Sequence, residues 1–574
     1  MTITDWLKSR EFESSLAVQF KVEGEWKTFK WSEYIDKIIS AAFNLKLIGL
    51  TKKDHIGLMS ATRWEWAALD MAILASQAVT VPMYPNLSDD DLTFIINQSD
   101  IKILIIEDEE QFGQVNRIKK NFDREIKLIR LGEIHFDDEF SATERKAFFT
   151  TASAIKPKDR ATIVYTSGTT GQPKGAVLLH SALVSEVVEA FDLFGIKPGF
   201  KSLTFLPFAH VLGRIEHWGS CYRGYTIAYA ESIEKIKSNL LEIQPDFLIA
   251  VPRIFEKVYA GIMSQVESQP IKQQLFSTAI ALAKEVVQYR QTKQPIPWKL
   301  LLKYEAFSQI AFSGIKKAFG GNLKFAVSGG APLSPQMADF FSYCGINILE
   351  GYGLTETCAA VCVNQLMDNQ PGTVGRPIGD VEIKFADDGE ILVKSKKCFV
   401  EYYKNPEATK ETLANGFFST GDIGEMTERG FLKITDRKKD LIKTAGGKYV
   451  APQKLEGLLK QDPLVSHVLI HGDQKKFVSA LISIDDFQLK QWAETQQIKF
   501  EDIGELFSNP VLKLRLQKLI QTVNSNLASF ESIKKFELTQ DPWTVENGCL
   551  TQSLKVKRKF IEKKYAELIT EMYE

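Results

Sequence analysis

The chain has 574 residues, of which 44% are apolar and 25% are charged, and its formal net charge is -1 at pH 7. This composition is ordinary for a globular protein, the length supports several domains, and the near-neutral charge gives no reason to expect nucleic acid as a partner. The six cysteines form no Cys-x-x-Cys pair and no framework spacing, which predicts reduced thiols rather than disulfides.

The apolar segments of the sequence predict neither a membrane-spanning nor a secreted chain. The first fifteen residues are charged and contain no apolar run, so we expect no secretion signal. The longest apolar neighbourhood, residues 67–83, is interrupted by Asp70 and Gln77 and stays below the ~20 residues that span a bilayer. We therefore expect a cytoplasmic protein, and peripheral contact with the inner face of a membrane stays open.

Residues 1–160 alternate between the two hydrophobic periodicities. Helices are predicted at 31–47, 64–75 and 92–98, and strands at 55–59, 78–83 and 101–106. An alternation of strands and helices is typical of an α/β sheet with parallel strands.

A small, polar stretch follows, Tyr165-Thr-Ser-Gly-Thr-Thr-Gly-Gln-Pro-Lys-Gly175, between two apolar runs. Its successive backbone N–H groups can point into one concavity, because glycines allow the φ values that this needs. The hydroxyls add donors and Lys174 adds a positive charge, so the stretch predicts a cradle for a polyphosphate. A flexible linker is the alternative, but linkers do not lie between two tight apolar runs. The Walker P-loop does not fit, because Lys174 precedes a glycine and the chain continues as a strand.

The next stretch ends a predicted strand, 202–208, in Leu206-Pro-Phe-Ala-His210. Ligands of α/β sheets lie at the C-terminal ends of strands, so His210 is a site candidate, although a lone histidine is more often structural. A strand at 246–252 then leads into Val251-Pro-Arg-Ile-Phe-Glu-Lys-Val-Tyr259, the start of an amphipathic helix. Residues 262–318 are helical with mixed charge and predict a solvated cover.

Two further strands, 324–327 and 346–349, each lead into a glycine turn: Ser328-Gly-Gly-Ala-Pro332 and Glu350-Gly-Tyr-Gly-Leu-Thr-Glu356. Adenine needs a flat aromatic face and backbone polar groups, which Tyr352 and the turn containing Gly330, Ala331 and Pro332 supply. Thr355 offers a hydroxyl to the α-phosphate, and Glu356 is a hard oxygen ligand suited to Mg²⁺.

The last third adds three polar stretches, each of which has a plainer interpretation. In Ser419-Thr-Gly-Asp422 the carboxylate can accept from both ribose hydroxyls, or the aspartate can simply belong to a β-turn. The run Asp436-Arg-Lys-Lys-Asp440 is charged, as solvated faces usually are. Near the end stands Leu550-Thr-Gln-Ser-Leu-Lys-Val-Lys-Arg558, in which Lys555 on its own reads as part of a basic, solvated tail.

Together these motifs resemble the AMP-forming adenylate ligases, the superfamily of acyl-CoA synthetases, luciferases and peptide-synthetase adenylation domains. The resemblance covers nearly the whole chain, and the stretches 206–210 and 251–259 are similar to the long-chain fatty acid–CoA ligases in particular. It implies an α/β fold with a large N-terminal domain of parallel-type sheets, residues 1–435. A hinge at 436–440 and a small, mobile α+β domain at 441–574 would follow.

The resemblance also implies roles for individual residues. ATP binding falls to Thr166, Ser167, Gly168, Thr169, Thr170, Lys174, Gly330, Ala331, Pro332, Tyr352, Gly353, Thr355, Asp422 and Arg437. Catalysis falls to Lys555, Thr355 and His210, magnesium binding to Glu356, hinge motion to Lys439 and CoA binding to Gly446 and Gly447. Two positions depart from the family pattern: Phe417-Phe418 follow Gly416 where a tryptophan is usual, and Gln552 replaces a proline.

The implied activity is ATP-dependent activation of a long-chain fatty acid to acyl-CoA through an acyl-adenylate, with release of AMP and pyrophosphate. ATP, Mg²⁺, CoA and a fatty acid are then the expected ligands. An adenylate-forming ligase with another acid or acceptor stays as the alternative. A non-catalytic lipid-binding relative would be expected to lack Lys555 or Glu356, and both are present.

Overall fold

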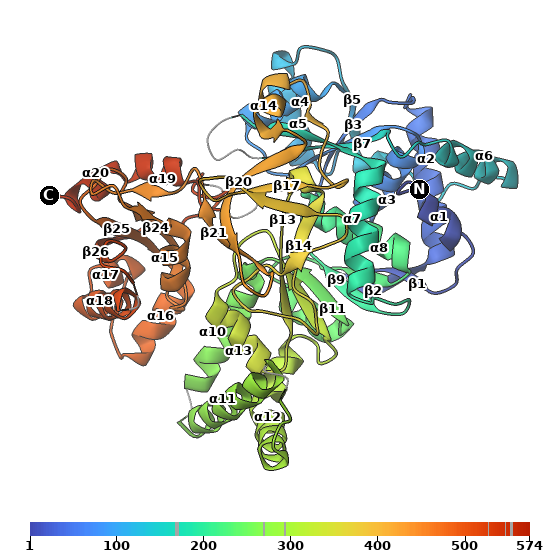
Figure 1. Ribbon diagram of the computed structural model, residues 1–574. Coiled ribbons are helices and arrows are strands. Elements are labelled where there is room, and N and C mark those ends of the chain that lie inside the picture. The colour runs from blue at the N-terminus through green and yellow to red at the C-terminus, as the bar shows by residue number, and fades with distance from the viewer. Residues whose placement is uncertain (167–171, 268–269, 292–293, 526, 546, 552–554) are drawn as a thin grey trace.

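The computed structural model describes residues 1–574 apart from 167–171, 268–269, 292–293, 526, 546 and 552–554. A large body of sheets and helices carries a smaller C-terminal unit on one side, while helices α11 (Pro270–Gln291) and α12 (Trp298–Ala318) project from it as an arm (Figure 1). The N-terminus lies on the body, away from the C-terminal unit.

A seven-stranded sheet of order β18-β8-β7-β4-β3-β5-β6 contains the strands predicted in the first 160 residues. Its strands are β3 (His55–Met59), β4 (Val79–Met83), β5 (Ile101–Ile106), β6 (Lys127–Arg130), β7 (Arg160–Thr166), β8 (Lys174–Leu179) and β18 (Glu401–Tyr402). The accompanying helices are α1 (Asp5–Arg10), α2 (Trp31–Leu47), α3 (Trp64–Ala75), α4 (Asp89–Ser99), α5 (Glu109–Ile118) and α6 (Ala142–Ser153). The three predicted strands and the three predicted helices are therefore confirmed, whereas β6, α1, α5 and α6 were not predicted.

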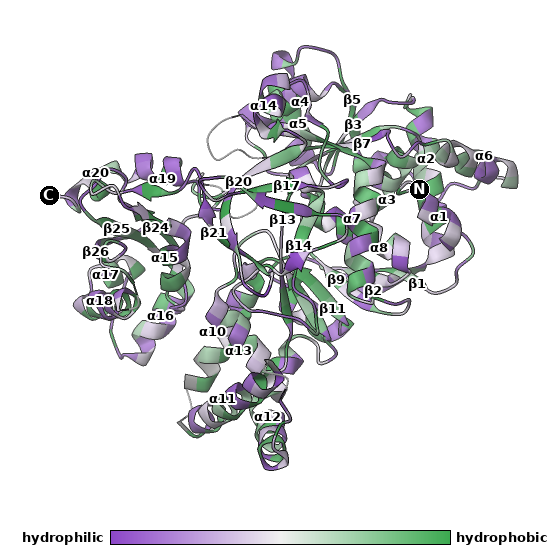
Figure 2. Ribbon diagram, in the orientation of Figure 1, coloured by the Kyte–Doolittle hydropathy of each residue, from purple (hydrophilic) through white to green (hydrophobic). Residues whose placement is uncertain are grey.

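A nine-stranded sheet of order β15-β14-β13-β12-β11-β9-β10-β1-β2 forms the other half of the body. Its strands are β1 (Leu16–Val22), β2 (Glu25–Lys30), β9 (Lys201–Thr204), β10 (Thr226–Tyr229), β11 (Phe247–Ala250), β12 (Phe325–Ser328), β13 (Ile348–Leu354), β14 (Ala359–Val363) and β15 (Arg376–Pro377). Its helices are α7 (His180–Leu193), α8 (Val211–Arg223), α9 (Ile236–Ile243), α10 (Pro252–Glu267) and α13 (Pro335–Tyr343). Figure 2 shows mainly hydrophobic residues along the strands β11 and β14.

The two large sheets are mixed, whereas the sequence predicted parallel strands. Strands β4, β3, β5 and β6 run parallel, as do β13, β12, β11, β9, β10 and β1, but β2, β8, β14, β15 and β18 are antiparallel to their neighbours. For β1 and β2 a short connection is the cause: Glu23 and Gly24, both with positive φ, join them in a two-residue turn, which permits only an antiparallel pair.

A smaller antiparallel sheet links the body to the C-terminal unit. It consists of β16 (Glu382–Phe385), β17 (Glu390–Lys394), β19 (Leu413–Ala414), β20 (Phe417–Met426) and β21 (Leu432–Arg437), with α14 (Pro406–Thr412) beside it. The antiparallel strands β16 and β17 form a hairpin around Asp387-Asp-Gly389, residue types that are typical of turns. Figure 1 shows β21 at the junction with the C-terminal unit.

The C-terminal unit has a three-stranded sheet of order β24-β25-β26 and hydrophobic cores of its own. Its elements are β22 (Ile442–Lys443), β23 (Tyr449–Val450), β24 (Val465–His471), β25 (Val478–Ile484), β26 (Ile533–Thr539), α15 (Pro452–Leu459), α16 (Asp486–Thr495), α17 (Ile503–Phe507), α18 (Pro510–Asn524), α19 (Arg558–Lys564) and α20 (Ala566–Glu571). These cores start at Ile442, while the largest core of the body ends at Leu432. The limits 435 and 441 themselves stay a prediction.

Three predicted boundaries are wrong, and each has a local cause. Strand β9 ends at Thr204, not at 208, because Pro207 lacks the N–H that a central strand needs. The predicted turn at 350–354 is strand, because Gly353 lets β14 approach: a Cβ there would lie 1.4 Å from Ala359 O. Asp422 lies inside β20 rather than in a turn.

Every helix in the described part of the chain falls short of the length or hydrophobicity needed to cross a bilayer. The six cysteines are free, as expected, and five of them are buried.

Candidate active site

The two strands that flank the polyphosphate stretch form a hairpin. Thr166, the last residue of β7, lies opposite Lys174, the first residue of β8, and its hydroxyl is 3.3 Å from Lys174 O. The Lys174 ammonium lies 5.1 Å from the centre of the Tyr402 ring. Ser167, Gly168, Thr169 and Thr170 lie outside the described residues, so their phosphate-binding role stays a prediction.

Glu356 lies in a buried 3₁₀ turn, Thr355–Thr357, directly after β13. The Tyr402 hydroxyl donates a hydrogen bond of 2.8 Å to Glu356 Oε1. Burial raises the pKa of Glu356, while Tyr402, Arg437 and Lys174 act to lower it. The carboxylate therefore faces the same space as the positive charge of the polyphosphate hairpin.

The same turn fits the expected magnesium. A carboxylate oxygen is the ligand type that Mg²⁺ prefers, and Mg²⁺ usually binds one or two carboxylates together with substrate phosphates. No cluster of three metal-binding side chains occurs within the described ranges of the chain. The arrangement therefore fits a magnesium ion that Glu356 and the phosphates of a bound nucleotide would hold together, rather than one held by protein side chains alone.

Asp422 joins an aromatic residue and a cation on neighbouring strands. The Tyr352 hydroxyl donates to Asp422 Oδ2 at 2.7 Å, and Arg437 Nε lies 3.1 Å from Asp422 Oδ1. Asp422 of β20 pairs directly with Arg437 of β21. Burial raises the pKa of Asp422, and Arg437 opposes this most. The three predicted nucleotide ligands thus meet, although Asp422 is held by sheet pairing and not by a turn.

The predicted adenine turn lies next to Tyr352. Strands β12 and β13 run parallel, with Ser328 opposite Glu350. Gly330 and Tyr352 each lie two residues beyond this pair, so both are on the side of the sheet toward which the two strands run. Gly330 has φ +80°, a value that favours glycine, and Ala331 and Pro332 after it are exposed. An exposed backbone turn beside a half-buried tyrosine ring can hold a planar base.

His210 caps the N-terminus of α8 instead of ending a strand. Its Nδ1 accepts a hydrogen bond of 3.2 Å from Leu212 N, which leaves Nε2 to carry the proton of the neutral ring. Burial lowers the pKa of His210 to about 4, and the charge of Lys555 adds to this effect. His210 is therefore a neutral N–H donor at physiological pH.

Lys555 approaches the body from the C-terminal unit. It directly precedes Val556, which forms an antiparallel β-bridge with Leu550. Although the side chain as a whole keeps access to solvent, crowding by protein atoms lowers its pKa to about 8. Arg437 also lowers this pKa, whereas Asp422 and Glu356 raise it. The structure therefore brings Lys555 into the electrostatic range of the nucleotide residues, rather than leaving it in a solvated tail.

Comparison with known proteins decides the family. The sequence profile of the AMP-binding enzymes matches residues 8–403, and that of the AMP-binding enzyme C-terminal domain matches residues 439–574. The chain belongs to the AMP-binding enzyme family.

Similar proteins include the long-chain-fatty-acid–CoA ligase FadD15 of Mycobacterium bovis, 35% identical over 563 residues that cover 96% of this chain and 93% of that protein. The peroxisomal long chain acyl-CoA synthetase 7 of Arabidopsis thaliana is 31% identical, with coverage of 96% and 82%. Among solved structures, the Mycobacterium tuberculosis fatty acyl CoA synthetase has a TM-score of 0.61 and 21% identity, with 99% of each chain covered. The adenylation domain of a Mycobacterium chelonae carboxylate reductase has a TM-score of 0.75 and 22% identity, with coverage of 100% and 91%. These two structures confirm the predicted fold class.

The contacts between the body and the C-terminal domain of this AMP-binding enzyme include residues of the 251–259 motif. The pairs are Lys460 with Glu256 at 3.6 Å, Arg253 with Asp485 at 3.9 Å, and Gln461 with Gln336 at 2.9 Å. The motif that resembled the long-chain branch therefore touches the C-terminal domain in the arrangement that brings Lys555 to the nucleotide residues.

The predicted CoA and hinge residues are exposed and take part in none of the contacts described above. Gly446 and Gly447 are exposed in the 444–448 turn, whose described hydrogen bonds stay within the C-terminal domain, to residues such as Lys475. Lys439 is exposed in the connection that follows β21. The structure thus does not place Gly446 or Gly447 with the nucleotide residues, and their role stays a prediction.

Tyr402 is a site residue that sequence reasoning missed. It contacts both Lys174 and Glu356, yet its surroundings, Phe399 to Tyr403, look like ordinary core sequence. The feature that could have indicated Tyr402 as a site residue is its hydroxyl group, carried by an aromatic ring at the end of an apolar run.

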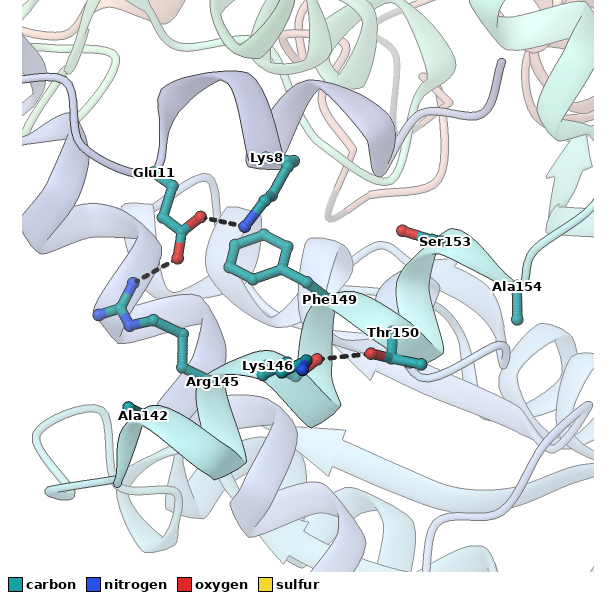
Figure 3. A pocket seen from close by; sticks show the side chains of 9 residues that line it. All are labelled: Lys8, Glu11, Ala142, Arg145, Lys146, Phe149, Thr150, Ser153 and Ala154. Atoms are coloured by element: carbon teal, nitrogen blue, oxygen red, sulfur yellow. Dashed lines mark hydrogen bonds and ion pairs between the residues drawn. The ribbon is translucent and has the colours of Figure 1, made fainter.

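A cavity of about 570 Å³ lies elsewhere, between α1 and α6. In Figure 3 its wall includes Lys8, whose ammonium is paired with Glu11 beside the Phe149 ring. No predicted site residue lines this cavity, so we assign it no part in the chemistry.

Proposed function

We propose that this AMP-binding enzyme is a long-chain fatty acid–CoA ligase. The observation that carries the proposal is that Asp422, Arg437 and Glu356 lie near enough to Lys555 for their charges to act on its pKa, in a chain similar to such ligases over nearly its full length. ATP, a fatty acid and CoA are the substrates, and the enzyme requires no nucleic acid partner.

In the first step a fatty acid carboxylate oxygen attacks the α-phosphate of ATP. The bond between the α- and β-phosphates breaks, pyrophosphate leaves and an acyl-adenylate remains. Lys174 and the 166–170 hydroxyls hold the outer phosphates, Asp422 and Arg437 hold the ribose, and Thr355 and Lys555 stabilise charge at the α-phosphate. Glu356 would hold Mg²⁺, which neutralises triphosphate charge when bound. Transfer of this kind depends mostly on positioning and on charge stabilisation.

In the second step the CoA thiol attacks the acyl carbonyl carbon, and AMP leaves with the oxygen that bridged carbon and phosphorus. His210, a neutral N–H donor at the start of α8, serves the acid substrate. Gly446 and Gly447 would admit the pantetheine arm after the C-terminal domain, 441–574, has turned about the 436–440 hinge.

The alternative is an adenylate-forming ligase for another acid or another acceptor. It shares the first step and differs in what accepts the acyl group. The two are separated by pyrophosphate release and by thioester formation over a panel of acids, with and without CoA.

We expect kcat/KM to rise from acetate to fatty acids of a dozen or more carbons, because each buried CH₂ can contribute up to ~0.8 kcal/mol. Thioester should form only when CoA is present. A preference for acetate or an aromatic acid, or pyrophosphate exchange without thioester, would favour the alternative.

A hinge variant separates the two steps. Proline fixes φ, so Lys439→Pro should hinder rotation between the domains. We expect acyl-adenylate formation to survive while thioester formation falls about tenfold or more, with Lys439→Ala as the matched control that keeps the rotation. Equal loss of both half-reactions would indicate misfolding and would contradict the hinge role.

The protein is also proposed to be cytoplasmic with peripheral membrane contact. Helix α12 exposes Trp298 (67%), Leu302 (57%) and Ile310 (67%) near Lys299 and Lys303, a combination typical of interfacial helices. Sedimentation with anionic vesicles should carry the protein down, and its absence from the pellet would contradict the contact.

A further inference from the structure

A buried ion cluster lies outside the residues that the proposed chemistry uses. The side chains of Lys397 and Glu186 are 0% and 1% exposed, with Lys397 Nζ 3.1 Å from Glu186 Oε2 and 2.9 Å from Glu189 Oε2. The two glutamates lie on α7, and Lys397 lies between β17 and β18. Burying charges costs free energy even when they are paired, so the stability of the ion pair alone does not explain the cluster.

Both partners hold the backbone of one residue, Ala360 on β14. Ala360 N donates a hydrogen bond of 2.8 Å to Glu186 Oε1, and Lys397 Nζ donates one of 3.1 Å to Ala360 O. Ala360 lies opposite Gly353, a predicted nucleotide residue on β13. The ion pair therefore fixes the start of the strand that follows the Thr355–Thr357 turn.

The backbone between that turn and Ala360 is strained. Cys358 has φ +58° and Ala359 φ +104°, values in the region that favours glycine. The Thr357 hydroxyl accepts from Leu354 N at 2.9 Å and lies 3.0 Å from Ala359 O. Such conformations persist only where the surroundings over-determine them, and they tend to occur at functional sites.

The segment that carries Lys397 also reaches Glu356. Phe399 N donates to Glu356 O at 2.6 Å, and the Tyr402 hydroxyl donates to its carboxylate at 2.8 Å. On the other side, α7 begins directly after β8, whose first residue is Lys174. The cluster thus connects the strand of the polyphosphate lysine with the turn of Thr355 and Glu356.

We propose that Lys397 and Glu186 are positioning residues for acyl-adenylate formation, which hold the strained turn in place by bonding both backbone groups of Ala360. They touch no substrate themselves. They keep Thr355 and Glu356 in register with Lys174 while charge builds at the α-phosphate. This inference rests on the proposed ligase function.

Two double variants test the proposal, and in both of them the Glu186 and Lys397 positions carry uncharged side chains. Glu186→Leu/Lys397→Met removes both bonds to Ala360, and apolar replacement of a buried pair often preserves stability. Glu186→Gln/Lys397→Met is the matched variant, because its amide oxygen still accepts from Ala360 N. Leu45→Ala, a fully buried residue on α2, serves as a control for lost stability alone.

Each protein is assayed below its melting temperature for ATP–pyrophosphate exchange with a fatty acid and for thioester formation from supplied acyl-AMP and CoA. Displacement of the turn by about 1 Å should lower exchange by about 100-fold in the Leu/Met variant. The Gln/Met variant should lose clearly less, and thioester formation should stay within a few-fold of wild type in both.

Wild-type exchange rates in the Leu/Met variant would overturn the proposal. So would equal loss of both half-reactions in proportion to the fall in melting temperature, as expected for Leu45→Ala. The single variant Lys397→Met, in which the buried Glu186 can take up a proton, gives the same comparison if the Leu/Met variant does not fold. Absence of exchange in the wild type would instead refute the ligase function itself.

Discussion

Lys555→Ala should lose acyl-adenylate formation by about 10²–10³-fold, the usual cost of removing one well-placed charge stabiliser. Lys174 lies in the polyphosphate hairpin, where we propose that it serves the outer phosphates, and the Thr355 hydroxyl is a neutral donor. Lys555 is a second cation near Asp422 and Glu356, beside Arg437, which is ion-paired with Asp422 at 3.1 Å. In the proposed second step AMP is the leaving group and the C-terminal domain would have turned away, so we expect conversion of supplied acyl-AMP and CoA to stay near normal.

Both half-reactions are to be measured on the same preparation, with Lys555→Arg as the charge-keeping control. A lysine of pKa about 8 is charged below that pH and loses its proton above it, so the wild-type kcat/KM for ATP should fall as pH rises through about 8. Arginine stays charged there, so Lys555→Arg should lose this fall even if its rate is lower at neutral pH. If the second half-reaction falls as far as the first in Lys555→Ala, Lys555 supports the fold or binds CoA instead.

Glu356→Gln should lose about 100-fold in overall rate and require a higher Mg²⁺ concentration for half-maximal activity. The amide keeps the size of the side chain but removes the charge, and a neutral oxygen is a poorer ligand for Mg²⁺ than a carboxylate. Tyr402→Phe is the matched control, because it removes only the hydrogen bond of 2.8 Å to the carboxylate and should give a smaller loss. An unchanged Mg²⁺ titration in Glu356→Gln would count against the metal role.

The sequence predicted site residues best where a polar residue interrupts a strand pattern. Lys174, Thr355, Glu356 and Asp422 all stand in small, polar stretches beside apolar runs, and the structure places them around one space. Their local structure was harder to predict. Asp422 lies in mid-strand because pairing with Arg437 extends β20 past the glycine that had suggested a turn.

Other features depend on contacts between distant segments, which no local pattern contains. Lys397 looks like one more exposed residue in Lys394-Ser-Lys-Lys397, yet it is fully buried against Glu186, 211 positions earlier. The sequence around Tyr402 is typical of a core segment, and only the fold shows that Tyr402 contacts both Lys174 and Glu356. The hinge and the CoA turn were inferred by resemblance. Their roles depend on a rotation between the domains, and the structure describes a single arrangement of these domains.

The central claim, an acyl-adenylate route from fatty acid to thioester, is tested most directly by oxygen transfer. A fatty acid labelled with ¹⁸O in both carboxylate oxygens is incubated with the enzyme, ATP, Mg²⁺ and CoA, and the products are analysed by mass spectrometry. Since the bond between the carbonyl carbon and the bridging oxygen breaks in the second step, the account predicts AMP that carries one ¹⁸O and acyl-CoA that keeps the other ¹⁸O in its thioester carbonyl. Pyrophosphate should carry no label. Label in inorganic phosphate with release of ADP, or unlabelled AMP, would contradict it.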